Sequence, residues 1–226
     1  MAIHLQVEHP WNVSLEQAKS IQLSLAQKVI THDDMPSEIR YVAGVDVGFV
    51  NKETTRAAIV VLDYPQLCVH ETSLGYTPIL FPYIPGYLSF REIPAILKAL
   101  QQLKTLPDLI LCDGQGIAHP RRLGIASHLG VLTGLPSIGI AKTRYIGDYQ
   151  EPKQAKGAWS PLVHEQKIIG AVLRSRVNVK PLFVSTGHRV SLETVISLTM
   201  SCVTRYRLPE PTRLADKLAS RKPINP

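Results

Sequence analysis

The chain has 226 residues, of which 45% are hydrophobic and 19% are charged. A chain of this length favours a single domain, expected over residues 1–226, and this composition excludes a disordered or collagen-like protein. No apolar run approaches the roughly 18 residues that a membrane-spanning helix needs, and the first residues contain no apolar signal core. We therefore expect a cytoplasmic protein that has no membrane partner.

The chain is basic, with 25 lysine and arginine residues against 18 aspartate and glutamate residues, a net charge of +7. This balance favours a polyanionic partner such as nucleic acid. Basic residues are also frequent in a C-terminal tail, where they are Arg205, Arg207, Arg213, Lys217, Arg221 and Lys222. A solvated tail without a specific partner is an equally good interpretation of that cluster.

The first part of the chain predicts one helix and three strands. A capping-box sequence at 14–17 and apolar residues at helical spacing predict a helix over about 15–30. Three β-rich stretches follow at 41–50, 56–63 and 68–76, separated by turn residues. We expect these strands to form an antiparallel meander.

The middle of the chain predicts a parallel unit. A proline-rich loop at 78–85 leads into an amphipathic helix that stops near Pro107. The continuous apolar runs at 109–112 and 136–141 are typical of strands buried on both faces. The segment between them predicts a helix. This βαβ pattern predicts two parallel strands.

The last part of the chain predicts a hairpin of strands at 167–173 and 181–184, a helix from Ser191 and a short helix after Thr212. Together the elements predict an α/β fold, in which a mixed sheet of an antiparallel meander and parallel strands is flanked by helices.

Asp46 stands in the middle of an apolar strand. A buried carboxylate without a partner is costly, so either the alternation of the strand puts Asp46 on a solvated face, or a metal ion or other cation compensates its charge. The flanking Gly44 and Gly48 leave room for a ligand to approach the backbone.

Two further carboxylates have both a functional and a structural interpretation. Asp113 ends the 109–112 strand, and ligands of α/β sheets gather at the carboxyl ends of parallel strands, although Asp113 is also suited to cap the glycine-rich turn after it. Glu92 completes a capping-box sequence with Ser89, but Pro94 disfavours an ideal helix start there. If the three carboxylates converge, they make an all-oxygen site suited to Mg²⁺ or Mn²⁺, which can activate water for attack on a phosphate.

Four motifs resemble those of the endonuclease V family. They are PYIPGYLSFRE at 82–92, DGQGIAHPR at 113–121, GIAK at 139–142 and PEPTR at 209–213, and the resemblance runs from about residue 41 to 220. It implies an RNase H-like fold and a Mg²⁺-dependent DNA repair endonuclease that recognises deaminated bases, chiefly hypoxanthine. Such an enzyme hydrolyses the second phosphodiester bond 3′ to the lesion and leaves 3′-hydroxyl and 5′-phosphate ends. The preference for DNA or RNA stays open.

The resemblance also implies roles for single residues. It makes Asp46, Glu92 and Asp113 the metal-binding carboxylates, with Mg²⁺ as the ion and Mn²⁺ able to replace it. Lys142 matches a lysine near the reacting phosphate. The family has a histidine or an aspartate in its last helix, and Asp216 stands here, so a histidine general base is absent at this position and the role of Asp216 stays open.

The same resemblance implies how a damaged base is bound. Tyr83 matches an aromatic wedge that fills the gap left when the base leaves the stack. The pocket for that base is implied to consist of Gly86, Leu88, Gly114, Ile125 and Gly139, with His119 beside it. A histidine that only supports the Asp113 loop is an equal alternative for His119, and the other seven histidines are assigned no chemistry.

Two other functions stay under consideration. One is a non-catalytic protein that binds inosine or distorted nucleic acid, which the complete set of carboxylates disfavours. The other is a different RNase H-like nuclease, such as a junction resolvase, which Tyr83 and the 113–121 motif disfavour. Nothing in the sequence demands a dimer, so we expect a monomer.

Overall fold

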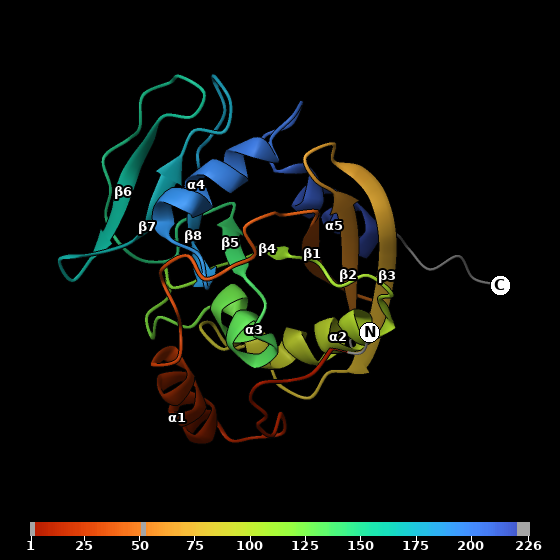
Figure 1. Ribbon diagram of the computed structural model, residues 1–226. Coiled ribbons are helices and arrows are strands. Elements are labelled where there is room, and N and C mark those ends of the chain that lie inside the picture. Colours follow the sequence, from red (N-terminus) through yellow and green to blue (C-terminus); the bar gives the residue numbers. More distant parts are fainter. Residues whose placement is uncertain (1–2, 51–52, 221–226) are drawn as a thin grey trace.

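A computed structural model describes residues 3–50 and 53–220, in which eight strands form one sheet and five helices surround it (Figure 1). The strands are β1 (Tyr41–Phe49), β2 (Thr54–Asp63), β3 (Cys68–Pro78), β4 (Leu109–Asp113), β5 (Ser137–Ala141), β6 (Trp159–His164), β7 (Lys167–Leu173) and β8 (Leu182–His188). The helices are α1 (Leu15–Ala26), α2 (Leu88–Gln102), α3 (Ile125–Thr133), α4 (Leu192–Ser201) and α5 (Glu210–Ala219).

The strand order in the sheet is β3-β2-β1-β4-β5-β8-β7-β6. Strands β1 to β3 form an antiparallel meander, and β1, β4 and β5 run parallel to one another. Helix α3 connects β4 to β5, which is the predicted βαβ unit. Strand β8 is antiparallel to both β5 and β7. The predicted α/β fold with a mixed sheet is confirmed.

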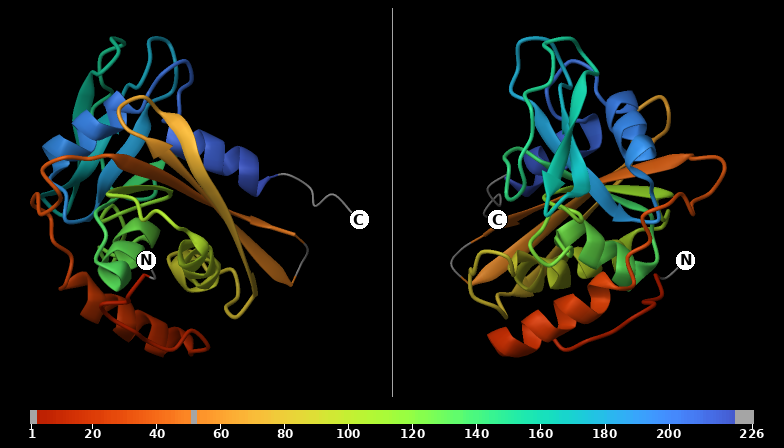
Figure 2. Two further views of the ribbon diagram at one scale, coloured as in Figure 1. Left: turned by 45° about the vertical axis from the view of Figure 1, so that its right-hand side comes forward. Right: turned by 90° about the vertical axis from the view of Figure 1, so that its left-hand side faces the viewer.

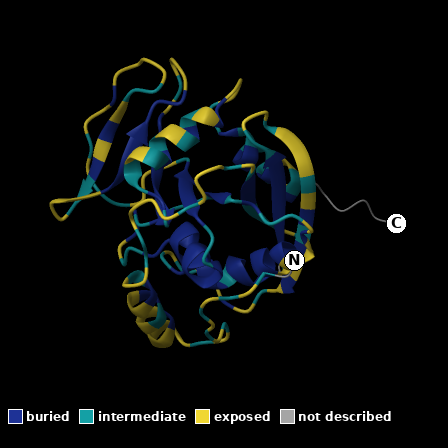
Figure 3. Cartoon of the chain, viewed as in Figure 1, coloured by how far each residue is buried: buried dark blue, intermediate teal, exposed yellow. Residues whose placement is uncertain are grey.

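Helices cover both faces of the sheet. Helices α2 and α3 pack on one face, and α4 and α5 on the other, while α1 lies outside α3 (Figure 2). Successive residues of β2 serve the two faces, because side chains alternate along a strand: Ile59 joins the core under α2 and α3, and Val60 joins the core under α4 and α5. The central strands are therefore buried on both sides (Figure 3).

The glycines beside Asp46 serve a helix rather than a ligand. A Cβ atom added to Gly44 would lie 1.9 Å from the carbonyl oxygen of Pro211, and one added to Gly48 would lie 2.7 Å from that of Ala219. The expectation that Gly44 and Gly48 leave room for a ligand is therefore wrong. They allow α5, whose first residues follow Pro209, to approach the β1 backbone, and this contact positions Asp216.

Several predicted boundaries differ from those observed. Helix α1 ends at Ala26 instead of about residue 30, because the chain then turns and the backbone N–H of Ile30 donates to His188. Tyr87, not Ser89, is the N-cap of α2, so the capping-box interpretation is wrong. Strand β6 was not predicted from its sequence, which contains Pro161, and it lies at the edge of the sheet, where proline is tolerated.

The C-terminal basic residues are mostly part of the folded chain. Residues 205–219 form a loop and α5, and the guanidinium of Arg207 is half-buried and donates to two carbonyl oxygens. Arg221 and Lys222 lie outside the described residues. In the part of the chain that the structure describes, no helix has the length and apolarity needed to cross a membrane.

Candidate active site

Two parallel strands bring two carboxylates together at the same edge of the sheet. The register of β1 and β4 pairs Val45 with Cys112, so Asp46 and Asp113, the next residue of each strand, are neighbours. Asp46 is half-buried, and the side chain of Asp113 is 16% exposed. This edge is where the sequence predicted that a ligand would bind.

Glu92 approaches these carboxylates from helix α2. It is the fifth residue of the helix, buried at 8% exposure, and its carboxylate has no hydrogen bond or ion pair within the described residues. Because Tyr87 caps the helix without a side-chain hydrogen bond, Glu92 is not needed at the helix start. Its negative charge faces those of Asp46 and Asp113.

Lys142 and Asp216 complete the cluster. Lys142 directly follows β5, and its Nζ lies 2.5 Å from Oδ2 of Asp113 and 3.9 Å from Oδ2 of Asp216, which α5 carries. The guanidinium of Arg207 donates to the backbone carbonyl of Lys142 over 2.9 Å. The strand end and the helix thus hold one cation against two carboxylates.

Burial and mutual repulsion change the acidity of this cluster. Burial and the charges of Asp46 and Asp113 raise the pKa of Glu92 to about 8. Burial, together with the charges of Asp113 and Asp216, raises the pKa of Asp46 to about 7. Burial also raises the pKa of Asp113, although Lys142 opposes that change. Lys142 alone therefore does not supply enough positive charge to compensate the negative charge of the three carboxylates.

This donor set fits a hard divalent cation. The pKa values of these three carboxylates are raised by burial and by neighbouring negative charges, and Glu92 has no hydrogen bond or ion pair within the described residues. They supply the oxygen ligands that such an ion prefers. Within residues 3–50 and 53–220, no three His, Cys, Asp or Glu side chains already surround a common point as ligands. The residues therefore fit a divalent cation by their charge and by the type of ligand atom they offer. Lys142 contacts Asp113, so its ammonium and a divalent cation would share that carboxylate.

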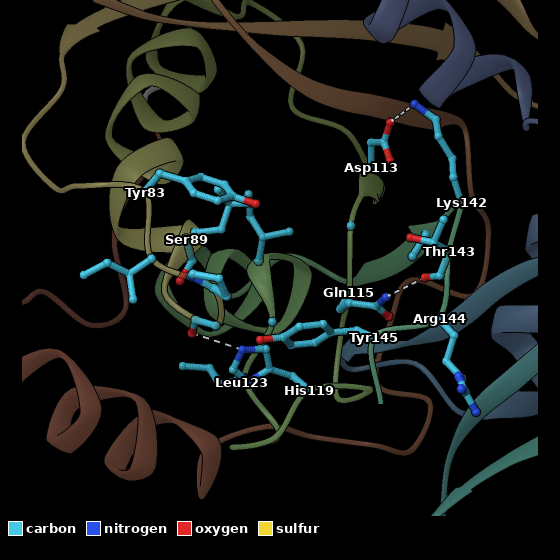
Figure 4. A pocket seen from close by; sticks show the side chains of 18 residues that line it. Tyr83, Ser89, Asp113, Gln115, His119, Leu123, Lys142, Thr143, Arg144 and Tyr145 are labelled. Carbon is cyan, nitrogen blue, oxygen red and sulfur yellow. Dashed lines mark hydrogen bonds and ion pairs between the residues drawn. The ribbon is translucent and has the colours of Figure 1, made fainter. Parts of the chain in front are cut away.

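A cavity of about 420 Å³ lies next to the carboxylates. Asp113 and Lys142 line it, so the cavity and the cluster share these two residues (Figure 4). Of the residues that the sequence predicted for base binding, six line this cavity: Tyr83, Gly86, Leu88, Gly114, His119 and Ile125. Asp46, Glu92 and Asp216 are not part of its lining.

Gly139 is the predicted pocket residue that the structure places elsewhere. A Cβ atom added to Gly139 would lie 2.2 Å from the backbone nitrogen of Gly116 and 2.8 Å from the carbonyl oxygen of Gly114. The residue does not line the cavity. Its lack of a side chain allows the 114–116 loop to pack on β5.

Both ring nitrogens of His119 are engaged by the protein. Nε2 lies 3.1 Å from the carbonyl oxygen of Gly86, and Nδ1 accepts from the backbone N–H of Arg121 over 3.2 Å. Burial and the neighbouring Arg121 lower the pKa of His119 to about 4, so the ring is neutral. A carbonyl only accepts, and Nε2 therefore carries the hydrogen. This arrangement favours a supporting role for His119.

The Gly86 carbonyl is held by two more donors. Nε2 of Gln22, on α1, donates to it over 2.9 Å, and the guanidinium of Arg121 donates over 2.7 Å. Oε1 of Gln22 in turn accepts from Nε of Arg121 over 2.6 Å. Arg121 also stacks over the ring of Tyr87 at 4.2 Å. Three side chains thus fix the loop that presents Tyr83.

Comparison with known proteins identifies the family. The sequence model of the Endonuclease V family matches residues 23–217. The chain belongs to the endonuclease V family. It is 59% identical over 215 residues to the endonuclease V of Trichormus variabilis, covering 95% of this chain and 97% of that protein.

Solved structures of endonuclease V proteins have the same fold. The Streptomyces avermitilis enzyme is 43% identical, with a TM-score of 0.89 over 94% of each chain. The Ciona intestinalis enzyme, in complex with a 24mer DNA containing an inosine followed by a ribo-adenosine, is 31% identical, with a TM-score of 0.79 over 91% of this chain and 95% of that one. The expected RNase H-like fold is confirmed.

Membership in the endonuclease V family establishes the class of activity. The chain is an endonuclease, its partner is nucleic acid, and the family implies a divalent metal cofactor. The non-catalytic binding protein and the other RNase H-like nucleases are thereby set aside.

Three residues around the endonuclease V cavity were not predicted as functional: Gln22, Arg121 and Tyr145. Gln22 carries a signal that the sequence analysis did not use, because it is a polar residue on the apolar stripe formed by Ala18 and Leu25, and it is fully buried. Tyr145 lines the cavity with its ring 5.7 Å from that of His119, and nothing in its local sequence indicates this position.

Proposed function

We propose that this endonuclease acts on strands that contain a deaminated purine, hypoxanthine in the first place, as part of DNA repair. It hydrolyses the second phosphodiester bond 3′ to the lesion and leaves 3′-hydroxyl and 5′-phosphate ends. The observation that carries the proposal is that Asp113 and Lys142 belong to both the cavity and the carboxylate cluster. An extruded base in the cavity therefore brings the adjoining backbone to the carboxylates. The inosine-containing DNA bound by the Ciona intestinalis relative supports the same substrate.

The carboxylates of Asp46, Glu92 and Asp113 would hold the divalent cation, which we propose to be Mg²⁺, with Mn²⁺ able to replace it. Their pKa values, raised by burial and by neighbouring negative charges, support this role, because a bound cation stabilises the ionised form of each carboxylate. When bound, the ion supplies a Lewis acid that stabilises negative charge on the phosphate oxygens and promotes ionisation of water.

Lys142 supplies the other positive charge of the reaction site. Its ammonium contacts Asp113 and faces Asp216, so it is held where negative charge accumulates on a reacting phosphate. Burial alone would lower the pKa of Lys142, but Asp113 and, to a smaller extent, Asp216 raise it, so the ammonium stays charged between two carboxylates. We propose that Asp216 orients Lys142. We also propose that its negative charge attracts the divalent cation from the side of the cluster that α5 forms.

The cavity accommodates the extruded base. Glycine at positions 86 and 114 allows close approach, and Leu88 and Ile125 supply apolar contact. We propose that Gly139 acts indirectly, through the 114–116 loop that packs on it. The side chain of Tyr83 is 69% exposed in the loop before α2, which suits a ring that enters the duplex in place of the base. We further propose that the chain acts as a monomer and that residues 1–226 form one catalytic domain.

The test is cleavage of end-labelled DNA and RNA strands that differ only by one inosine, in Mg²⁺ or in EDTA. Asp46→Ala and Asp113→Ala are compared with Asp63→Ala, a control that lies at the other end of the β1 and β2 pair. We expect a Mg²⁺-dependent cut one nucleotide beyond the inosine, present in Asp63→Ala and lost in the other two variants. Uncut inosine strands in both polymers, or cleavage that ignores inosine, would reject the proposal.

A further inference from the structure

Two histidines to which the sequence assigned no chemistry are directly hydrogen-bonded to each other. His9 lies in the segment before α1, and its Nε2 is 2.8 Å from Nε2 of His128, on α3. His9 Nδ1 is 2.9 Å from the carbonyl oxygen of Pro10, and His128 Nδ1 is 2.9 Å from Oγ of Ser89. A continuous chain of hydrogen bonds therefore runs from the Pro10 carbonyl to Ser89, which lines the cavity.

Burial favours the neutral form of both rings. His128 is fully buried, and burial lowers its pKa well below the ordinary value. Burial also lowers the pKa of His9, although its hydrogen bond to Pro10 opposes the change. Each ring therefore carries one hydrogen, and its other nitrogen accepts.

The partners fix where each hydrogen lies. A carbonyl oxygen only accepts, so the hydrogen of His9 is on Nδ1 and its Nε2 is an acceptor. The hydrogen of His128 must then be on Nε2, where it donates to His9. His128 Nδ1 is left as an acceptor, and the hydroxyl of Ser89 donates to it.

The single hydrogen of the Ser89 hydroxyl is thereby committed to His128. What Oγ still offers to its surroundings is lone pairs, so towards a ligand it is an acceptor only. Ser89 is 3% exposed and lies in the first turn of α2, between the loop that carries Tyr83 and the carboxylate of Glu92. A group of the cavity whose hydrogen-bonding direction is fixed is suited to distinguish bases.

We propose that Ser89 is a specificity-determining residue, held as an acceptor by the His9–His128 pair, whose Oγ accepts the N1–H of hypoxanthine. The inference rests on the proposed function, because it concerns the base in the same cavity. Hypoxanthine carries a hydrogen on N1, whereas adenine, the base from which it arises by deamination, has a lone pair there. With adenine in the cavity, its N1 and Ser89 Oγ would face each other as two acceptors without a hydrogen between them. Binding of adenine is then disfavoured, because a buried polar group is left without a hydrogen-bond partner.

The experiment compares strands in which one nucleotide is either inosine or nebularine, whose unsubstituted purine has an N1 lone pair as adenine does. The variant is Ser89→Ala, and the matched control is Ser127→Ala, since Ser127 is also a fully buried serine but bonds to the Thr186 carbonyl and does not line the cavity. The readouts are the inosine-to-nebularine ratio of kcat/KM in Mg²⁺ and the corresponding ratio of Kd in EDTA.

We expect both ratios to fall about tenfold in Ser89→Ala and to stay unchanged in Ser127→Ala. His9→Phe provides a second test. A phenyl ring keeps the contacts of His9 with Trp11 and Phe90, at 4.4 and 5.4 Å between centroids, but releases the hydrogen of His128 from Nε2. His128 can then donate to Ser89, so the ratio falls in this variant as well.

A loss of stability alone lowers activity on both strands and leaves their ratio at the wild-type value. Equal effects of Ser89→Ala on the inosine and nebularine strands would therefore overturn the role of Ser89. An unchanged ratio in His9→Phe would overturn the role of the histidine pair. If the wild type cleaved no inosine strand, the proposed function would fail first, which is a different result from an altered ratio.

Discussion

Lys142 Nζ lies 2.5 Å from Oδ2 of Asp113, and the two residues are the boundary between the cavity and the carboxylate cluster. This ion pair has two consequences. On the proposed function, the ammonium supplies positive charge beside the reacting backbone, and it competes with a divalent cation for the Asp113 carboxylate. Loss of the Lys142 ammonium should therefore lower the rate of cleavage but raise the affinity for a divalent cation.

Lys142→Met is expected to lower kcat by on the order of 100-fold, because a preorganised charge near the phosphate is lost. The same variant is expected to bind Mn²⁺ more tightly than the wild type, because the ammonium no longer occupies Asp113 or repels the ion. Titration calorimetry with Mn²⁺ measures the second effect without any turnover. Lys98→Met, an exposed lysine on α2, is the control. Weaker Mn²⁺ binding by Lys142→Met would contradict the competition.

Removal of the metal is expected to make stability depend on pH in a definite direction. The pKa of Glu92 is raised from 4.5 to about 8 and that of Asp46 from 3.8 to about 7, mainly by burial. Each of these carboxyl groups holds its proton in the folded chain at a pH where it has already lost it in the unfolded chain, so this contribution to the free energy of unfolding falls as the pH rises. The buried histidines have the opposite effect below about pH 6.5, because burial lowers the pKa of His119 and of His188 from 6.5 to about 4. In EDTA we therefore expect Tm to decrease from about pH 7 to about pH 8 and to level off above it.

Glu92→Gln separates this effect from other titrations. The amide has no charge to repel Asp46, so we expect a flatter Tm profile in EDTA and a higher Tm than the wild type at about pH 8. Glu38→Gln, an exposed glutamate, should keep the slope of the wild type. A wild-type Tm that rises from about pH 7 to about pH 8 in EDTA would show that ionisation of the carboxylates does not destabilise the folded chain.

The sequence predicted those parts of the structure that depend on local pattern. The apolar run ending at Asp113 predicted a buried parallel strand, and Asp46 lies on the neighbouring strand, so their adjacency follows from topology. The capping-box interpretation of Ser89 failed because Tyr87 begins the helix, and it is His128, 39 residues away, that engages the Ser89 hydroxyl. Contacts between distant segments of this kind leave no local pattern.

The role of Gly44 shows why contacts between distant segments could not be predicted from the sequence. A glycine beside Asp46 indicates close approach, but whether a ligand or a helix approaches depends on how α5 packs, more than 160 residues later in the chain. The hydrogen bond between Gln22 and Gly86 depends likewise on α1 docking outside α3. A glutamine on an apolar stripe of a helix indicates that its amide has a hydrogen-bond partner, but the sequence does not show which residue that partner is.

Gln22→Ala is expected to loosen the loop that carries Tyr83. It removes one donor from the Gly86 carbonyl and leaves Nε of Arg121 without its acceptor, an effect of about 1–3 kcal/mol on a buried group. We expect kcat/KM on inosine strands to fall about tenfold, chiefly through a higher KM, because the cavity is less well formed before binding. Gln17→Ala, which alters only the exposed cap of α1, should keep KM. Equal KM values in the two variants would contradict the positioning role.

Tyr83→Ala is expected to act on duplex substrates more than on single strands. The side chain is 69% exposed, so its removal should leave Tm unchanged. If Tyr83 is the wedge that we propose, its ring fills the gap left by the extruded base in a duplex and offsets a few kcal/mol of lost stacking, whereas a single strand leaves no such gap. We therefore expect cleavage of inosine in a duplex to fall about tenfold more than cleavage in a matched single strand. Tyr83→Phe keeps the ring and should behave as the wild type on both substrates. An equal loss on both would assign Tyr83 to general nucleic-acid contact instead of the wedge.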